Sequence, residues 1–396
     1  MISLVLTGLV VVLLVPVVIF SLQCFLSLIP AKRSKTPVVR DASPRTTVLI
    51  PAHNEADIIH GIIQDVTAQL KEADRVFVIA DNCTDETADL ARAVAPEAPN
   101  GFNVTVVERQ HATERGKGYA LDHAFKLGLA RTADQRPDAF LVVDADTHAH
   151  DQLLSATTEA FTLGAEALQV PYHSGDPDSS TRARLQHLAL LCFNHLRPKS
   201  REALGASVGI LGNGFGLRAS LLERVPYTAA SIVEDLEYHI NLVRAGSRVR
   251  FVSETQVSAD APPNAAGTET QRSRWEGGRF RMAMDHVPGL AAEVLRGRLR
   301  LAEPLFELLL LPLAFHVLLL LPLLVLPFAL TQLYALGALA LIVAHVLAGI
   351  FACGGSLKDL GALAVAPFYV GWKLLMLPKI LAAGRKSATW SRTERS

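Results

Sequence analysis

The sequence predicts an α/β domain with a mostly parallel sheet, flanked by apolar helices that can cross a membrane. Two observations carry this prediction. Strand-like and helix-like patterns alternate through residues 41–300, as in sheets covered by helices on both faces. Residues 1–31 and 308–357 contain no Asp, Glu, Lys or Arg. The 396 residues are enough for one catalytic domain plus membrane segments.

The first apolar stretch, residues 1–31, is long enough to span a bilayer, which takes roughly 20 residues. A cleaved signal peptide is the alternative, but it would need a basic start and a small-residue cleavage site. Here the basic residues lie at 32–40, after the apolar stretch. We therefore expect an uncleaved anchor whose following domain is cytoplasmic.

The second apolar stretch fits two spanning helices that turn near Thr331. A third stretch carries two lysines and two prolines, which favours an interfacial or re-entrant segment over a span. We expect a multi-pass protein of the inner (plasma) membrane with three spans and its amino terminus outside. The expected parts are an anchor at 1–31, a cytoplasmic domain at 41–300, two spans at 304–353, an interfacial or re-entrant segment at 361–382 and a basic cytoplasmic tail at 383–396.

Composition excludes several classes of protein. With 38 basic and 38 acidic residues, the formal net charge is zero, whereas nucleic-acid binders usually carry a basic excess. The four cysteines are isolated from one another and form no C-x-x-C pair. Neither a zinc site nor a disulfide framework is indicated, and a reducing compartment fits the soluble part.

Within the central region, β-rich runs at 47–50, 75–79, 104–107 and 140–143 alternate with helical stretches such as 57–70 and 84–94. Ligands bind such sheets beyond the carboxyl ends of the strands. Polar clusters follow the strands here, where this rule places a site. The sequence therefore predicts a binding site along this edge of the sheet.

Three clusters each allow a functional and a structural interpretation. Glu55, after the first strand, can contact a ribose or base, or belong to a helix start capped by Asn54. Asp81, after the second strand, can accept from a uracil N–H; alternatively this cluster is a helix cap, with Thr84 or Asp85 starting the next helix. Lys117, between two glycines, can approach a phosphate or lie in a solvated turn, without the spacing of a P-loop.

Asp144 and Asp146 follow the fourth strand as a D-x-D pair. Two carboxylates at this spacing can bind one hard divalent cation, Mg²⁺ or Mn²⁺, which can bridge a diphosphate. A purely structural role is disfavoured because paired carboxylates repel each other without a cation. His148 and His150 are nearby, although histidines in loops usually face solvent.

Two later motifs complete the set. In Glu234-Asp235 a carboxylate can act as general base on an acceptor hydroxyl, or both acids can form the acidic first turn of a helix at 235–244. Gln271, Arg274 and Trp275 share one face of a helix. Arginine can bind a diphosphate and tryptophan can stack on a sugar, a combination unusual for plain surface.

In this order, Pro51-Ala52-His53-Asn54-Glu55, Asp81, Asp144-Ala145-Asp146, Glu234-Asp235 and Gln271-Arg272-Ser273-Arg274-Trp275 resemble the membrane-bound family 2 glycosyltransferases. This set is similar to the cellulose and poly-N-acetylglucosamine synthases, with the short bacterial exopolysaccharide members nearest. The resemblance implies a GT-A (Rossmann-like) fold, a UDP-sugar donor, a divalent cation and inversion at the anomeric carbon. It also implies a glycan or lipid-linked acceptor and partners for polysaccharide export.

The resemblance also implies residue roles. Glu55, Asp81, Lys117 and Asp144 would contact the nucleotide-sugar, and Asp144 and Asp146 would bind the metal. Asp235 would be the catalytic base. The diphosphate and acceptor end would be lined by Gln271, Arg274 and Trp275. The stretch 212–214 borders the donor sugar. Val233 departs from the threonine of the large cellulose synthases, and three spans make a short membrane part for polymer export.

Two other activities stay open at this stage. One is a glycolipid glycosyltransferase of the ceramide or hopanoid type. The other is a phosphatase, since Asp144-Ala145-Asp146-Thr147 matches a D-x-D-x-T nucleophile motif. No G-D-x-x-x-D acid pair follows, which disfavours the phosphatase.

Overall fold

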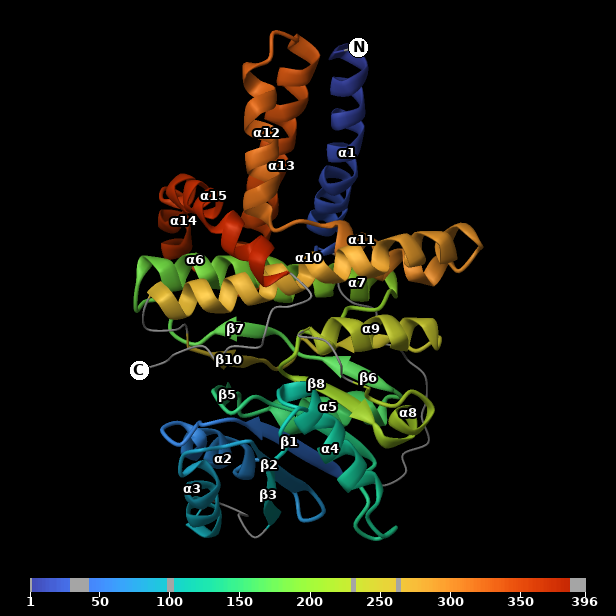
Figure 1. Cartoon of the computed structure of the whole chain (residues 1–396), viewed down its shortest axis with the longest axis vertical. Helices are drawn as coiled ribbons and strands as arrows, with labels where there is room; N and C mark the ends of the chain where they lie inside the picture. The colour runs from blue at the N-terminus through green and yellow to red at the C-terminus, as the bar shows by residue number, and fades with distance from the viewer. Residues whose placement is uncertain (1, 29–42, 98–102, 229–232, 261–264, 385–396) are drawn as a thin grey trace. The chain divides into compact units, whose positions relative to one another are not determined.

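A computed structural model describes residues 2–28, 43–97, 103–228, 233–260 and 265–384 (Figure 1). The chain groups into two compact units. The first, called the helical unit, comprises residues 1–31, 177–206 and 261–396; the second, called the sheet unit, comprises residues 32–176 and 207–260. The basic residues at 32–40 and most of the tail at 383–396 lie outside the described residues.

The strands of the sheet unit are β1 (Thr46–Ala52), β2 (Arg75–Asp81), β3 (Val104–Arg109), β4 (Ala139–Val142), β5 (Thr147–Ala149), β6 (Ala167–Gln169), β7 (Tyr172–Ser174), β8 (Phe215–Arg218), β9 (Val249–Phe251) and β10 (Val257–Ala259). Its helices are α2 (Ile59–Thr67), α3 (Thr87–Val94), α4 (Lys117–Leu129), α5 (Leu153–Thr162), α8 (Ala219–Arg224) and α9 (Glu234–Arg244). The four predicted strands and two predicted helices are confirmed, with the helices beginning two to three residues later than expected.

Within the described residues, seven strands form one sheet in the order β3-β2-β1-β4-β8-β6-β9. The pairs β1–β2, β1–β4, β2–β3 and β6–β9 are parallel, whereas β8 runs antiparallel to β4 and β6. A second sheet has the order β5-β10-β7. The predicted mostly parallel α/β fold is therefore confirmed.

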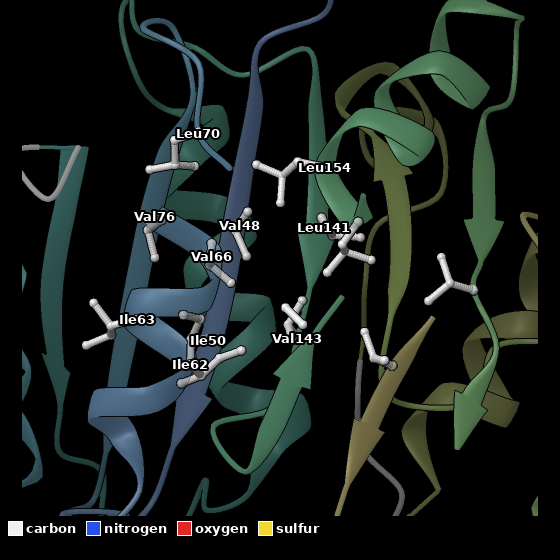
Figure 2. Packing of buried hydrophobic residues seen from close by; sticks show 14 of the residues in the cluster. Val48, Ile50, Ile62, Ile63, Val66, Leu70, Val76, Leu141, Val143 and Leu154 are labelled. Carbon is white, nitrogen blue, oxygen red and sulfur yellow. The ribbon is translucent and has the colours of Figure 1, made fainter. Parts of the chain in front are cut away.

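Alternate residues of the buried strands face two separate cores, as the period of a strand requires. Val48 and Ile50 of β1 pack with Ile62, Ile63 and Val66 of α2 (Figure 2). On the opposite face, Leu49 belongs to a second core, with the apolar side of α4. Because both faces are covered, the strands are continuous apolar runs, which is why they could be recognised in the sequence.

The helical unit contains α1 (Ile2–Leu26), α6 (Thr181–Leu190), a π-helical turn (Leu191–Leu196), α7 (Arg197–Leu204), α10 (Ala265–Leu295), α11 (Ala302–Leu309), α12 (Leu313–Val325), α13 (Ala329–Ala352), α14 (Leu357–Leu363) and α15 (Ala366–Ala383). Its helices α1, α12 and α13 pack side by side (Figure 1).

Among the described residues, two helices are long and apolar enough to cross a membrane, at 5–26 and in α13. Two bent helix pairs, 299–325 and 357–383, raise that number to four if each pair is one span. The turn expected near Thr331 lies slightly earlier, since α13 begins at Ala329. The expected domain ranges and the number of spans stay predictions.

Candidate functional site

The predicted site residues of the sheet unit follow strands that are neighbours in the sheet. Strands β2, β1 and β4 lie side by side and run parallel, so their carboxyl ends share one edge. Asp81 ends β2, Glu55 follows β1 and Asp144 follows β4. The common edge expected from the sequence is therefore present.

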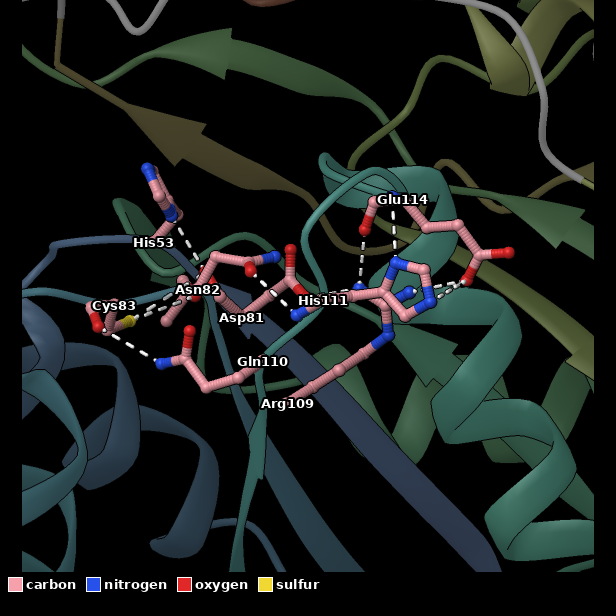
Figure 3. A network of polar contacts seen from close by, with 9 residues as sticks. His53, Asp81, Asn82, Cys83, Arg109, Gln110, His111 and Glu114 are labelled. Atoms are coloured by element: carbon pink, nitrogen blue, oxygen red, sulfur yellow. Dashed lines mark hydrogen bonds and ion pairs between the residues drawn. The ribbon is translucent and has the colours of Figure 1, made fainter.

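At one part of this edge, Asp81 is paired with an arginine that the sequence reasoning missed. Arg109 ends β3 directly beside Asp81, and its Nη1 donates to Asp81 Oδ1 at 2.7 Å (Figure 3). The same guanidinium donates to the carbonyl of Glu114 at 2.8 Å and to its Oε2 at 3.0 Å. Both Asp81 and Arg109 are buried. Arg109 thus fixes the Asp81 carboxylate and draws the 110–114 loop to it.

The turn after β1 is fixed by the loop after β2. Asn54 has a φ of 57°, and its side-chain oxygen accepts from Thr84 N at 2.7 Å. The amide of Glu55 donates to Thr87 Oγ1 at 2.8 Å. The alternative that Asn54 caps the next helix is wrong, because α2 begins at Ile59 and its N-cap residue is Ile58. The contact of Glu55 with a ribose or base stays a prediction.

At another part of the edge, Lys117 joins two segments far apart in the sequence. It is the first residue of α4, after Gly116 with a φ of 116°. Its ammonium forms an ion pair with Asp144 and donates to the carbonyl of Gly212 at 2.6 Å. A solvated turn is therefore excluded. Burial opposes the charge, but Asp144, Glu234 and Asp235 outweigh it and raise the pKa of Lys117.

The 212–214 loop holds Asp144 from the other side. The side-chain oxygen of buried Asn213 accepts from Asp144 N at 3.1 Å, and its amide donates to Thr147 Oγ1 at 2.8 Å. Gln169, buried at the end of β6, donates to the carbonyl of Asn213 at 2.6 Å and accepts from Leu211 N at 2.8 Å. Gln169 was also missed; a polar residue ending an apolar strand was its only signal.

The two acids at the start of α9 approach this same loop, and the predicted helix is confirmed. A Cβ added to Gly212, which has a φ of 81°, would lie 3.1 Å from Asp235 Oδ2 and 3.9 Å from Lys117 Nζ. Burial, followed by the charge of Asp235, raises the pKa of Glu234 to about 8, and burial also raises the pKa of Asp235. We call Lys117, Asp144, Glu234 and Asp235 the acidic cluster.

Asp146 and the two nearby histidines differ in their surroundings. Asp146 is half-buried beside Asp144 in the chain, whereas His148 and His150 are exposed. His148 lies 3.5 Å from Asp260, and His150 contacts Gln256 at 2.9 Å. Both histidines thus contact residues that flank β10, in agreement with the solvent-facing alternative.

The carboxylates of Asp144 and Asp146 fit a hard cation by the chemistry of their oxygens. No group of three or more His, Cys, Asp or Glu side chains able to hold a metal occurs among the described residues. Mg²⁺ usually takes one or two carboxylates and completes its shell with water and substrate phosphate.

Gln271, Arg274 and Trp275 lie on α10, a continuous helix, so the predicted helical spacing is present. Gln271 is buried, and Arg274 and Trp275 are half-buried. They belong to the helical unit, whereas the acidic cluster belongs to the sheet unit. Their role at the diphosphate and acceptor end stays a prediction.

Comparison with known proteins supports one family. The family described as Glycosyltransferase like family 2 matches residues 44–278. The chain is 23% identical over 240 residues to the "Probable glycosyltransferase YdaM" of Bacillus subtilis (strain 168), a match covering 59% of this chain. It spans about half the length of that curated relative, 55%.

A solved structure shows the same fold. The mannosyltransferase PcManGT from Pyrobaculum calidifontis, in complex with GDP-Man and Mn²⁺, has a TM-score of 0.55 at 18% identity, covering 96% of this chain and 97% of that chain. Glucosyl-3-phosphoglycerate synthase from Mycobacterium tuberculosis has a TM-score of 0.40 at 22% identity, covering 56% and 72%, too low to carry a conclusion. With the family match over more than half of its length, the chain belongs to glycosyltransferase family 2 and has the GT-A fold.

Proposed function

We propose that this glycosyltransferase moves a sugar from a UDP-sugar to a hydroxyl of a glycan or lipid-linked acceptor, with inversion at the anomeric carbon. The observation that carries the proposal is the acidic cluster. Lys117 pairs with Asp144 of the D-x-D motif, and Gly212 leaves room beside Asp235 of the E-D motif. One site thereby contains groups for a diphosphate and a base for a hydroxyl.

The donor nucleotide is proposed to lie along the ends of β1, β2 and β4. Asp81, held by Arg109, would accept from the uracil N–H, with Glu55 nearby. Lys117, at the start of α4, offers an ammonium to the phosphates in addition to the positive end of a helix dipole. Asn213 holds the backbone of Asp144, and the ion pair with Lys117 keeps its carboxylate at the end of α4 until the donor binds.

Asp144 and Asp146 would hold Mg²⁺ or Mn²⁺. When bound, the cation neutralises charge on the leaving diphosphate. Asp235 would take the proton of the acceptor hydroxyl while the oxygen of that hydroxyl attacks the anomeric carbon. The raised pKa of this carboxyl makes it a stronger base than an ordinary aspartate. Gln271, Arg274 and Trp275 are proposed to complete the diphosphate and acceptor end.

The experiment is a donor panel on the full chain in detergent. Release of nucleoside diphosphate is measured with UDP-glucose, UDP-N-acetylglucosamine, UDP-galactose and UDP-glucuronate. GDP-mannose is included because a similar structure was solved with GDP-Man. Preference for one UDP-sugar, lost in Asp144→Asn, supports the proposal. Activity with GDP-mannose alone would overturn the UDP assignment, and hydrolysis of a generic aryl phosphate would support the phosphatase instead.

The same preparation tests the metal and the acceptor. EDTA should abolish transfer and Mg²⁺ or Mn²⁺ should restore it; full activity in EDTA would exclude a metal role. Radiolabelled sugar appearing in an organic extract indicates a glycolipid product, the alternative acceptor class. Label retained in the aqueous polymer fraction indicates a glycan and would make partners for export worth seeking.

We further propose that the protein is an inner-membrane protein with three spans, its catalytic domain and tail in the cytoplasm. The candidate spans at 5–26 and in α13 support membrane association, and the basic residues at 32–40 and 385–395 support the orientation. A reporter that is active only outside the cytoplasm, fused after Ser396, should be silent. Strong reporter activity would mean that the segment 361–382 crosses the membrane.

A further inference from the structure

The helical unit contains a buried cation that the proposed reaction does not use. Arg197, the first residue of α7, is only 3% exposed. Burial lowers the pKa of Arg197 to about 10, so it still carries its charge at neutral pH. Within the described chain, its Nε and Nη1 have no hydrogen-bond partner, and no carboxylate is paired with it.

Two nearby arginines of the same unit are each paired with a carboxylate. Arg201, one turn later on α7, lies 3.3 Å from Glu303 and also pairs with Glu307. Arg279 of α10 lies 2.5 Å from Glu307. These half-buried cations are balanced by carboxylates of α11, as a low-dielectric surrounding requires. Arg197 alone among these three is left without an anion in the described residues.

The neighbours of Arg197 are aromatic rings and neutral polar groups. Its guanidinium lies 5.5 Å from the ring of Phe20 and 4.9 Å from that of Phe193. Contacts with aromatic faces offset only part of the cost of removing a guanidinium from water. A second compensating group of opposite charge is therefore expected.

Further polar groups gather around Phe20. The rings of His316 and His345 lie 5.0 and 5.1 Å from the Phe20 ring, centroid to centroid. Their partners are neutral: the His316 ring lies beside the backbone carbonyls of Leu311 and Pro312, and His345 Nδ1 contacts Cys24 Sγ at 3.5 Å. Both histidines are at most 2% exposed. Either ring can donate an N–H to an anion.

These groups lie at one end of the three-helix bundle. His316 is near the start of α12, Phe20 lies six residues before the end of α1, and His345 lies seven residues before the end of α13. The other buried residues of these helices are mostly apolar, such as Leu13, Val17 and Leu320, with polar Gln23 and Thr331 among them. Arg197 directly follows a π-helical turn, an irregularity frequent at functional sites. With α1 and α13 in a membrane, this polar end is placed where a lipid headgroup lies.

We propose that Arg197, with His316 and His345, binds a phosphate-bearing anion between α1, α7, α12 and α13, in the form of a phospholipid headgroup or free phosphate. Guanidinium and imidazole N–H groups are the donors that phosphate oxygens prefer. Basic pockets between membrane helices on the cytoplasmic side are known to suit acidic headgroups. Because the groups are closed off in this structure, the helices must part slightly for the anion to enter.

The test uses the full chain, delipidated in a neutral, phosphate-free detergent, with melting followed by tryptophan fluorescence. Dioctanoyl phosphatidylglycerol should raise the Tm on the order of 5 °C at about a hundred times its Kd. Dioctanoylglycerol, which lacks the phosphate, should not. Inorganic phosphate identifies the source: an equal rise indicates free phosphate, and no rise indicates the lipid headgroup.

Arg197→Met removes the charge while keeping much of the side-chain length. Without lipid, this variant should melt at or above the wild-type Tm, because an uncompensated buried charge has been removed. It should not respond to phosphatidylglycerol. Arg298→Gln, at an exposed position of the same unit, should respond like wild type. Arg197→Gln replaces the methionine variant if that variant does not fold. Equal responses of wild type and either Arg197 variant, or no response of wild type, would overturn the proposal.

Discussion

Two polar clusters lie on the same sheet edge and differ in how their charges are balanced. At the ends of β2 and β3, buried Arg109 is paired directly with Asp81, and the second acid, Glu114, is half exposed to water. In the acidic cluster, Asp144, Glu234 and Asp235 surround a single cation, Lys117. The first cluster is compensated within the chain, whereas the second has an excess of negative charge.

The difference separates a positioning role from a reactive one. A compensated pair holds two loops together and has little to gain from a new partner. An excess of half-buried carboxylates favours binding of a proton or a cation, and burial together with the charge of Asp235 raises the pKa of Glu234 to about 8. Strongly perturbed carboxyls beside a lysine at the end of a parallel sheet are typical of a catalytic site.

The largest effect is expected from Asp235→Asn, which keeps the shape of the residue and removes its basic oxygen. Turnover should fall about a hundredfold to ten-thousandfold, the usual contribution of a general base. UDP-sugar binding, measured by calorimetry, should persist, since the donor is proposed to bind Asp81, Asp144 and Asp146. Turnover is followed by UDP release.

Glu234→Gln is the matched control, because neighbours at the start of a helix point about 100° apart. It should affect turnover less. Near-normal turnover in Asp235→Asn together with loss in Glu234→Gln would reverse the assignment. If neither substitution matters, the base lies elsewhere.

Arg109→Met should have the next largest effect, and on stability first. Removing one partner of a buried ion pair typically costs about 3–5 kcal/mol, because the other charge is left uncompensated. Asp81 is that charge, at 4% exposure. Urea unfolding of the full chain measures the loss. Arg92→Met is the control, since Arg92 is exposed on α3 and its ion pairs contribute little. A similar small loss in both variants would mean that the Asp81 pair is not structurally important.

These two clusters also show how far the sequence alone can lead. The strands and their terminal acids were predicted because apolar runs and the polar residues after them are local patterns. The pairing of Asp81 with Arg109 links residues 28 apart and depends on the register of β2 against β3. The bond from Lys117 to Gly212 joins residues 95 apart. Such pairs follow from three-dimensional packing, which no local pattern encodes.

The residues to which the resemblance assigns roles differ in how far the structure brings them together. Asp144, Lys117 and Asp235 come together in the sheet unit, although no local feature required this. Gln169 was outside the catalytic expectations, because a buried amide that holds a loop resembles any other polar residue in the sequence. Gln271, Arg274 and Trp275 lie on the expected helix, because helical spacing is a local pattern.

Gly212→Ala tests the acidic cluster by a smaller change. Alanine at a φ of 81° is strained, and its Cβ would press on Asp235 at 3.1 Å. Displacement of the base by a few tenths of an ångström should lower turnover about tenfold. Gly164→Ala is the control, since its φ of 88° imposes similar strain in the turn after α5. Equal turnover in the two variants would show that the space beside Asp235 is unimportant.

The smallest effect is a pH dependence of stability in the donor-free protein. Glu234 has a folded pKa of about 8 against 4.5 for the free side chain, so the folded state binds more protons than the unfolded state between these values. Its stabilising contribution is complete below about pH 4.5 and is lost as the pH rises through about 8. Glutamine cannot titrate, so the Tm of wild type should fall relative to that of Glu234→Gln as the pH rises from 5 to 8. Glu223→Gln, at an exposed position on α8, should melt in parallel with wild type. If the Tm of Glu234→Gln also changes with pH in parallel with that of wild type, Glu234 does not titrate with a raised pKa. The contrast between the two clusters would then depend on Asp235 alone.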